Sequence, residues 1–121
     1  MEPRAVIVAD TEGVICYWSP GAEALFGHAP PEAIGRTLDL LVPDSHRSRH
    51  WVGFRKAMAI SGKIDPGGIV SVPVRKASGE VERFAVRIVV LTDAWGTSTG
   101  AVAVFAPLSA QPPATEPLYE L

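Results

Sequence analysis

The segment Val81–Thr92 is the feature that most constrains the fold of this chain. Hydrophobic side chains recur in it at every second position, at Phe84, Val86, Ile88 and Val90. This period of two residues is typical of a β-strand that packs one face on a hydrophobic core. The segment therefore predicts a sheet that is covered on one side.

Shorter hydrophobic segments rich in β-branched residues have the same character. They are bounded by turn signals such as Asp10–Gly13 and Ala77–Glu80, in which glycine and polar residues cluster. The first two follow each other closely enough to form a hairpin. These additional predicted strands are Ala5–Ala9, Val14–Trp18, Ile69–Lys76 and Gly100–Phe105.

Helical signals lie between the second and third predicted strands. Ser19 and Pro20 fit an N-cap followed by proline at the first helical position. Asp44 or Ser45 can cap the longest helix, which is expected to extend to about Ala59.

This order of elements predicts an α+β fold. Its simplest packing is a five-stranded antiparallel sheet with short helices and one longer helix over one face. Residues 1–106 are expected to form a single domain. Residues 107–121 are rich in proline and are expected to form a flexible C-terminal tail.

The composition supports a folded domain and excludes several kinds of partner. Hydrophobic residues make up 47% of the 121 residues and the net charge is −2, so neither disorder nor nucleic-acid binding is expected. No hydrophobic segment approaches the roughly 20 residues that span a bilayer, so no membrane association and a cytoplasmic location are expected. The single cysteine, Cys16, is expected to be a small core residue.

The short motifs of common catalytic sites do not occur in the sequence. It contains no G-x-S-x-G, no phosphate-binding G-x-x-x-x-G-K-[ST] and no H-E-x-x-H. The chain is therefore not expected to be an enzyme, and a binding or sensory function is favoured.

The longest predicted helix places one histidine, His50, beside both hydrophobic and basic residues. His50 and Phe54 are four positions apart and lie on the same side of the helix. A neutral imidazole that points from a helix into a hydrophobic cavity can coordinate haem iron. If the ring points outward instead, the domain is a plain interaction module.

Other polar residues of this helix have simpler interpretations. His46 precedes His50 by four positions, but no third metal ligand is evident, so His46 is expected to be exposed near the helix start. Arg47 and Arg49 belong to a basic cluster, with Arg55 and Lys56, that could pair with haem propionates. A solvated helix face is the expected environment of both arginines.

Three stretches of the chain, together with the order of its elements, resemble PAS domains. The stretches are VIVADTEGVICYWSPGAEALFG (residues 6–27), EAIGRTLDLLVP (32–43) and the turn RKASGE (75–80), and the resemblance covers about residues 5–106. It implies that the sheet and the helices enclose a pocket. It also implies a sensor or dimerisation module, a class that often holds haem, flavin or a small organic ligand.

The chain is most similar to the haem-binding PAS domains of rhizobial oxygen-sensing histidine kinases. Their approximate pattern of A-E-x-L-F-G, E-A-x-G and P-x-x-x-R-S-R-H corresponds to Ala22–Gly27, Glu32–Gly35 and Pro43–His50. The resemblance implies that His50 is the proximal iron ligand of a b-type haem. It further implies that Lys56 helps to hold a haem propionate.

One position departs from that family. Its members carry an arginine that stabilises bound oxygen, and the spacing from His50 places this position at Val70. An apolar side chain cannot donate a hydrogen bond, so carbon monoxide, nitric oxide or a redox change is favoured over stable oxygen binding. Trp95, in the loop before the last strand, is another possible N–H donor, and the sequence leaves its direction open.

Hydrophobic residues of the long helix and of the later strands are expected to contact the cofactor. These residues are Phe54, Val70, Val72 and Ile88. The same alternation also describes an ordinary filled core, so the sequence leaves two functions open.

The first function is a haem-based sensor of a diatomic gas or of redox state, which forms a homodimer. It is expected to signal to a partner protein in trans, or to be part of a longer protein, because no output domain is evident. The second is a cofactor-free or small-metabolite-binding PAS module for protein interaction and dimerisation. A flavin is the remaining alternative cofactor.

Overall fold

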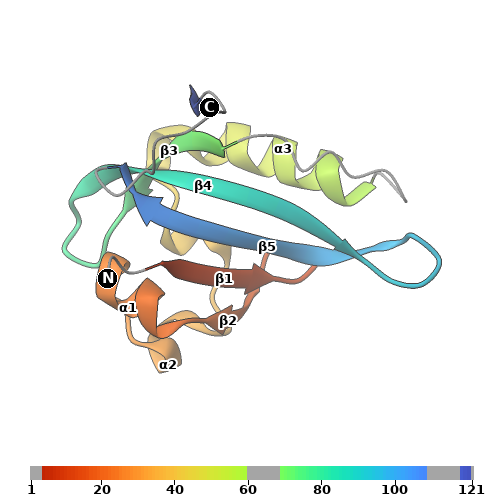
Figure 1. The fold of residues 1–121 in the computed structure, drawn as a ribbon, viewed down its shortest axis with the longest axis horizontal. Helices are drawn as coiled ribbons and strands as arrows, with labels where there is room; N and C mark the ends of the chain where they lie inside the picture. The colour runs from red at the N-terminus through yellow and green to blue at the C-terminus, as the bar shows by residue number, and fades with distance from the viewer. Residues whose placement is uncertain (1–3, 60–68, 109–117, 121) are drawn as a thin grey trace.

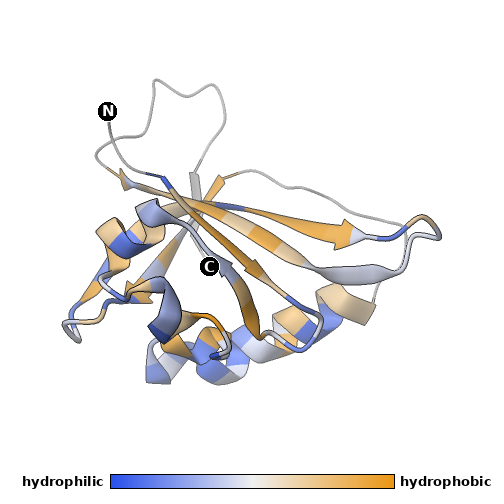
Figure 2. Cartoon of the chain, turned by 90° about the horizontal axis from the view of Figure 1, so that it is seen from below, coloured by the Kyte–Doolittle hydropathy of each residue, from blue (hydrophilic) through white to orange (hydrophobic). Residues whose placement is uncertain are grey.

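The sheet of this domain has six strands in the order β2-β1-β5-β4-β3-β6. Figure 1 shows the strands in front of the helices, and Figure 2 shows the helices gathered on one side of the sheet. The structure is a computed structural model and describes residues 4–59, 69–108 and 118–120. The elements are β1 (Ala5–Ala9), β2 (Ile15–Trp18), α1 (Pro20–Phe26), α2 (Pro30–Ala33), the 3-10 helices η1 (Leu38–Leu40) and η2 (Asp44–His46), α3 (Arg47–Ala59), β3 (Ile69–Arg75), β4 (Val81–Thr92), β5 (Ser98–Pro107) and β6 (Leu118–Glu120).

The five strands from β1 through β5 pair as the sequence predicted. Every neighbouring pair from β2 across to β3 is antiparallel, and β1 and β2 form the expected hairpin. The predicted α+β class, with a five-stranded antiparallel sheet under helices on one face, is confirmed. Strand β6 was not predicted: it pairs parallel with β3, within the segment expected to be a tail. The rest of that segment, from residue 109 to 117 and at 121, lies outside the described residues, and the division at residue 106 stays a prediction.

Local capping explains the first helix. The Ser19 hydroxyl oxygen accepts hydrogen bonds from the backbone N–H of Ala22 at 3.1 Å and of Val6 at 2.8 Å, so it both caps α1 and fixes it to β1. Gly27 ends α1 with a φ of 94°, a left-handed conformation that glycine adopts without strain. These contacts confirm the predicted start of the helix.

The core lies between the sheet and the first helices. Phe26 of α1 packs edge-to-face on Phe84 and on Phe105, with both pairs of ring centroids 5.1 Å apart. Trp18 is buried beside them and donates its indole N–H to the backbone carbonyl of His28 at 2.8 Å. This aromatic cluster fills one end of the space under the sheet, and the other end is left to α3.

Cys16 differs from its predicted place in the core. The pairing of β1 with β2 contains an irregularity between Val8 and Ala9, and as a result Ile15 and Trp18 are buried while Cys16 is exposed. A bulge of this kind puts two consecutive residues of one strand on the same side of the sheet. The period of two residues therefore assigns Cys16 to the wrong face.

The longest helix also begins differently from its prediction. Residues Asp44–His46 form the turn η2, and the regular helix α3 begins at Arg47. None of the helices within the described ranges is long and hydrophobic enough to cross a membrane.

Candidate functional site

A cavity of about 410 Å³ lies between α3 and the inner face of the sheet. Strand β4 contributes Val86, Ile88 and Val90 to its wall, and β5 contributes Ala101, Ala103 and Phe105. The volume is within the range of about 300–1,000 Å³ that is usual for small-molecule sites. The cavity is therefore large enough for a bound organic ligand, and its sheet side is hydrophobic.

Helix α3 presents one of its sides to this cavity. The lining residues of α3 follow a spacing of three and four positions, at Arg49, His50, Gly53, Phe54, Ala57 and Met58. The polar members of this set come first along the helix, and the hydrophobic members come last. The cavity consequently has a polar end near the start of α3.

His50 lies on the cavity wall and is held there by aromatic packing. Its ring centroid is 4.9 Å from that of Trp51 and 6.1 Å from that of Phe54, which lies nearly parallel to it. The Nδ1 atom is buried and has no hydrogen-bond partner among the described residues. A metal-bound histidine usually donates its second ring N–H to an acceptor, and the described part of the chain provides none for Nδ1.

The protonation of His50 follows from this environment. Burial disfavours the charged imidazolium and lowers the pKa of His50 below its ordinary value of 6.5, while the negative charge of Asp39 partly opposes this shift. The ring is therefore neutral at neutral pH. Neutral imidazole is the form that binds metal ions.

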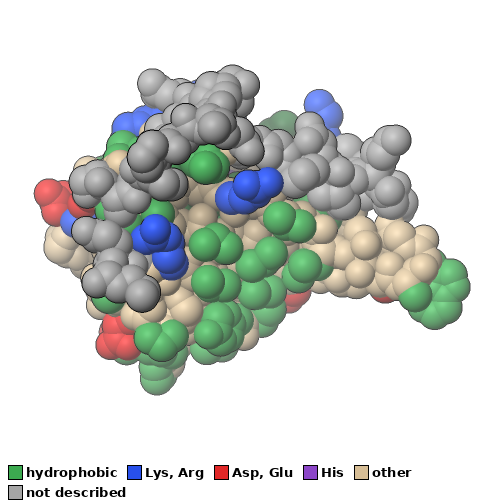
Figure 3. Space-filling model, viewed as in Figure 1, with side chains coloured by type: hydrophobic (Ala, Val, Ile, Leu, Met, Phe, Trp, Pro, Cys, Tyr) green, Lys and Arg blue, Asp and Glu red, His purple; other side chains and the backbone are tan. Residues whose placement is uncertain are grey.

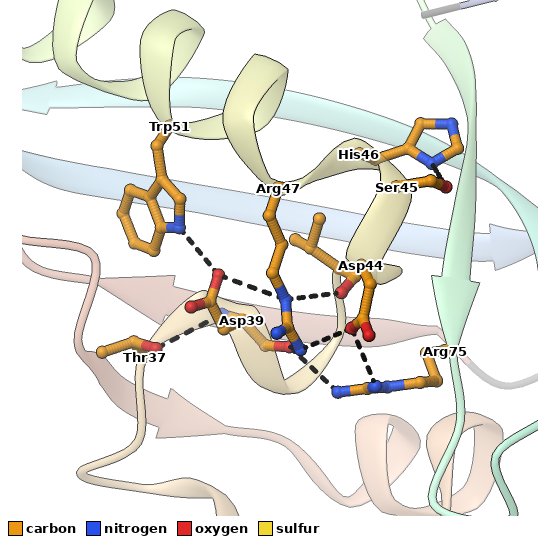
Figure 4. Close-up of polar contacts among 9 residues, drawn as sticks. Thr37, Asp39, Asp44, Ser45, His46, Arg47, Trp51 and Arg75 are labelled. Atoms are coloured by element: carbon orange, nitrogen blue, oxygen red, sulfur yellow. Dashed lines mark hydrogen bonds and ion pairs between the residues drawn. The ribbon is translucent and has the colours of Figure 1, made fainter.

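Figure 4 shows a polar cluster that fixes the start of α3 to the rest of the domain. The indole Nε1 of Trp51 donates to Asp39 Oδ1 at 2.7 Å, and Arg47 Nη2 donates to the backbone carbonyl of Asp39 at 3.2 Å. Asp44 Oδ1 lies 3.2 Å from Arg47 Nη2 and 3.3 Å from Arg75 Nη1, which joins α3 to β3. Arg47 is thus engaged in ion pairs, and its predicted solvated environment was wrong.

The structure brings together most of the residues predicted to contact a cofactor. His50, Phe54, Val72 and Ile88 all line the cavity. Val70 packs against the hydrophobic core instead, and Lys56 is exposed; neither residue is on the cavity wall. The cofactor contacts assigned to these residues stay predictions.

The sequence did not predict that His46 and Arg49 line the cavity. His46 was expected to be exposed, but it is partly buried and lines the cavity. Arg49 was expected on a solvated face and is exposed, and it also borders the cavity. The spacing of four positions between His46 and His50 was the available signal, because a helix places such residues on the same side.

Trp95 does not reach the cavity. It lies in the turn between β4 and β5, is 87% exposed and is not among the lining residues. The lining residues that β3, β4 and β5 contribute within the described ranges are all hydrophobic. Neither Trp95 nor these strands therefore place a side-chain hydrogen-bond donor opposite His50.

The described residues also lack a site for a bare metal ion. They contain no group of three or more histidine, cysteine, aspartate or glutamate side chains that are close enough to share one ion. A metal at His50 would therefore need a cofactor that brings most of its own ligands.

An antiparallel sheet, helices over one face and a hydrophobic cavity beneath them define a class of small α+β domains. Within that class, the family model described as the PAS fold matches residues 2–108, and the chain belongs to the PAS family. As a PAS domain it is a sensory domain.

Comparison with known proteins supports the same assignment. The chain is 48% identical over 48 residues to the sensor protein FixL of Bradyrhizobium diazoefficiens; the match covers 40% of this chain and 10% of that protein. An uncharacterised protein of Azorhizobium caulinodans is 36% identical over 78 residues, which are 64% of this chain and 11% of that protein. The chain thus spans about a tenth of the length of these relatives.

Two solved structures share the fold at low sequence identity. The PAS domain of a Colwellia psychrerythraea protein has a TM-score of 0.74 and is 19% identical, covering 89% of this chain and 88% of that chain. The PAS domain of the Cronobacter turicensis RpfR quorum-sensing receptor, in complex with C12:0, has a TM-score of 0.70 and is 14% identical, covering 89% and 96%.

Proposed function

We propose that this chain is a cytoplasmic PAS sensor that binds b-type haem through His50. The observation that carries the proposal is the partly buried ring of His50 on the wall of a hydrophobic cavity. The R-S-R-H motif, which ends at this residue, supports the same role. Residues 43–50 follow the pattern of haem-binding PAS domains.

The residues present fit such a group. A single neutral histidine suffices as the protein ligand because the porphyrin supplies the other in-plane nitrogens. Bound haem would supply reversible binding of a diatomic gas and one-electron redox chemistry. His50 would hold the iron, and Phe54, Val72 and Ile88 would exclude water from the ring.

The wall opposite His50 favours certain signals. The residues that β4 and β5 place on it are hydrophobic, and Val70, at the position of the oxygen-stabilising arginine, packs into the core. Bound oxygen is stabilised by a hydrogen bond, whereas carbon monoxide binds well without one. We therefore propose carbon monoxide, nitric oxide or redox state as the sensed signal.

An absorption spectrum of the protein loaded with haemin tests the haem proposal. The wild type is expected to show a Soret band above that of free haemin, and His50→Ala is expected to lose or shift it. His28→Ala is a matched control, since His28 lies outside the cavity wall. A Soret band that is identical in wild type and H50A would contradict the role of His50.

We propose that ligand binding shifts the sheet, and that the outer face of the sheet contacts a second copy of the chain and a partner protein in trans. Figure 3 shows hydrophobic side chains gathered on the outer face of the sheet. Val8 pairs with Tyr17 on one side and with Val102 on the other, which gives a continuous row across three strands. Val102 lies between Ala101 and Ala103, which line the cavity, so a ligand and a partner would touch opposite faces of β5.

The proposed dimer can be tested on this outer face. Val104 of β5 is 39% exposed there, and Val52 of α3 is 65% exposed on the other side of the domain. We expect Val104→Lys to convert a dimer into a monomer in light scattering, because a buried unpaired charge is unfavourable at an interface. Val52→Lys should leave the mass unchanged. A dimer that survives V104K would exclude this face.

The second candidate function is a PAS interaction module whose cavity holds a small metabolite or is filled by side chains. The absence of an acceptor for His50 Nδ1 among the described residues favours it, and a domain of the same fold is known in complex with C12:0. This module would purify without colour. A yellow preparation would indicate flavin instead.

A further inference from the structure

The charge of the cavity wall indicates what kind of ligand it accepts. Its titratable lining residues within the described ranges are His46, Arg49 and His50, and no carboxylate side chain is among them. The three lie within one turn and a half of the start of α3. The wall is thus hydrophobic at one end, and its other end carries the guanidinium of Arg49 beside two imidazole rings.

Arg49 is the basic residue of this end that has no partner among the described residues. Arg47 is held by Asp39 and Asp44, and Arg55 lies over the Trp51 ring at 5.9 Å from its centroid. Arg49 makes no hydrogen bond or ion pair within the described residues, although it lines the cavity. A guanidinium with free donors on a cavity wall is suited to bind a carboxylate.

Exposure places Arg49 at the mouth of the cavity. Arg49 and Gly53 of α3 and Ile88 of β4 are the lining residues that are also exposed, so the cavity opens between these two elements. A Cβ atom added at Gly53 would meet nothing within 4 Å, which shows open space beside the helix. Val86 and Phe105, in contrast, are buried on the wall further in.

We infer that the ligand has a hydrophobic body and a carboxylate, and that Arg49 binds the carboxylate at this mouth, with a ring N–H of His46 as a second donor. The inference deepens the proposed function and rests on ligand binding in the same cavity. Haem propionates and the carboxylate of a fatty acid share this chemistry. The assignment differs from the predicted propionate contact of Lys56, which lies off the wall.

Binding titrations of purified domain with two pairs of probes test the inference. The first pair is haemin and its dimethyl ester, followed by Soret absorbance; the second is dodecanoic acid and 1-dodecanol, followed by calorimetry. We expect Arg49→Gln to weaken binding of at least one of the two acids about tenfold and to leave its uncharged counterpart unchanged. Arg49 is exposed and has no partner in the part of the chain that the structure describes, so R49Q should keep the melting temperature of the wild type.

Control variants separate this result from its alternatives. Arg36→Gln changes an exposed arginine away from the cavity and should bind like the wild type. Lys56→Gln should do the same; a loss in K56Q with no loss in R49Q would overturn the inference. Equal affinity of the wild type for each acid and its uncharged counterpart would overturn it as well.

The haem proposal and this inference fail in different ways. Absence of a Soret band with a tenfold effect of R49Q on dodecanoic acid would remove haem and keep the carboxylate site. A His50-dependent Soret band that is indifferent to R49Q and to esterification would keep haem and remove the site. If neither acid binds the wild type, the inference is wrong.

Discussion

His50 is the residue at which burial and charge act on the same ring. Its pKa in the folded domain lies below the value of about 6.5 in the unfolded chain, chiefly because of burial. As the pH falls from 6.5 through the lower folded pKa, the unfolded state binds more protons, so the domain loses stability over that range.

This predicts a pH profile that His50→Gln should change. Above about pH 7 the difference in unfolding free energy between the two proteins should be constant, since the ring is neutral in both states. Below pH 6.5 the wild type should lose stability faster than H50Q. Urea denaturation across this pH range measures the difference, and parallel profiles would mean that the ring is not buried as described.

The charge of Asp39, which lies outside the cavity wall, is predicted to change the pKa of His50. Its negative charge raises the pKa of His50, against the larger effect of burial. Asp39→Asn keeps an oxygen that can accept the Trp51 indole N–H but removes the charge, so the pKa of His50 should fall further. NMR titration of the histidine ring protons measures the shift. Asp44→Asn, in the same polar cluster, should leave it nearly unchanged, and a rise in D39N would contradict the charge effect.

For single residues, the sequence predicted which side chains share a helix side better than it predicted their contacts with other elements. His50 and Phe54 could be placed on one helix side because their spacing of four is local information. The exposure of Cys16 depends on the irregular pairing between β1 and β2, and the ion pair of Arg47 with Asp39 depends on η1 being folded next to α3. Such contacts join separate elements, which no local pattern contains.

At the scale of elements, α3 carries a glycine that its position does not require. Gly53 lies inside the helix, and an added Cβ would meet nothing within 4 Å. Alanine is favoured over glycine in a helix by about 0.8–1 kcal/mol, so Gly53→Ala should raise the free energy of unfolding by about that amount. Thermal and urea denaturation measure it.

Gly13 serves as a control for Gly53, because an added Cβ at Gly13 has no space. It has a φ of 80°, and a Cβ there would collide with the Trp51 ring, so Gly13→Ala should destabilise the domain. Loss of stability in G53A would show that the helix side at Gly53 is covered rather than open.

Element boundaries were predictable where a hydrophobic segment is bounded by clear turn signals. The predicted bounds of Ala5–Ala9 and Val81–Thr92 agree with β1 and β4. Strand β5 extends beyond the predicted Gly100–Phe105 at both ends, because it pairs with β4 from Ser98 to Pro107. The parallel pairing of β6 was missed for the same reason: strand pairing is decided by a distant partner.

At the scale of the whole molecule, the domain contains a hydrophobic cavity, open between α3 and β4, that a ligand can fill. Packed interiors leave few voids larger than a water molecule, so a cavity of about 410 Å³ leaves side chains of β4, β5 and α3 without contacts. The ligand-free domain should therefore be less stable than the liganded one. By mass action, a ligand at 100 times its dissociation constant stabilises the folded state by about 2.7 kcal/mol.

A cavity-filling substitution tests whether an empty cavity lowers the stability of the domain and whether a ligand restores it. Ala103 of β5 lines the cavity, between Ile7 and Ile88 on the neighbouring strands. Ala103→Leu should raise the melting temperature of the ligand-free domain by restoring contacts, and should abolish the increase that haemin or dodecanoic acid gives the wild type. Ala24→Leu, at an exposed position of α1, should keep that increase. If A103L melts lower without ligand and keeps the full ligand-induced increase, the ligand binds elsewhere, since side chain and ligand cannot occupy the same volume.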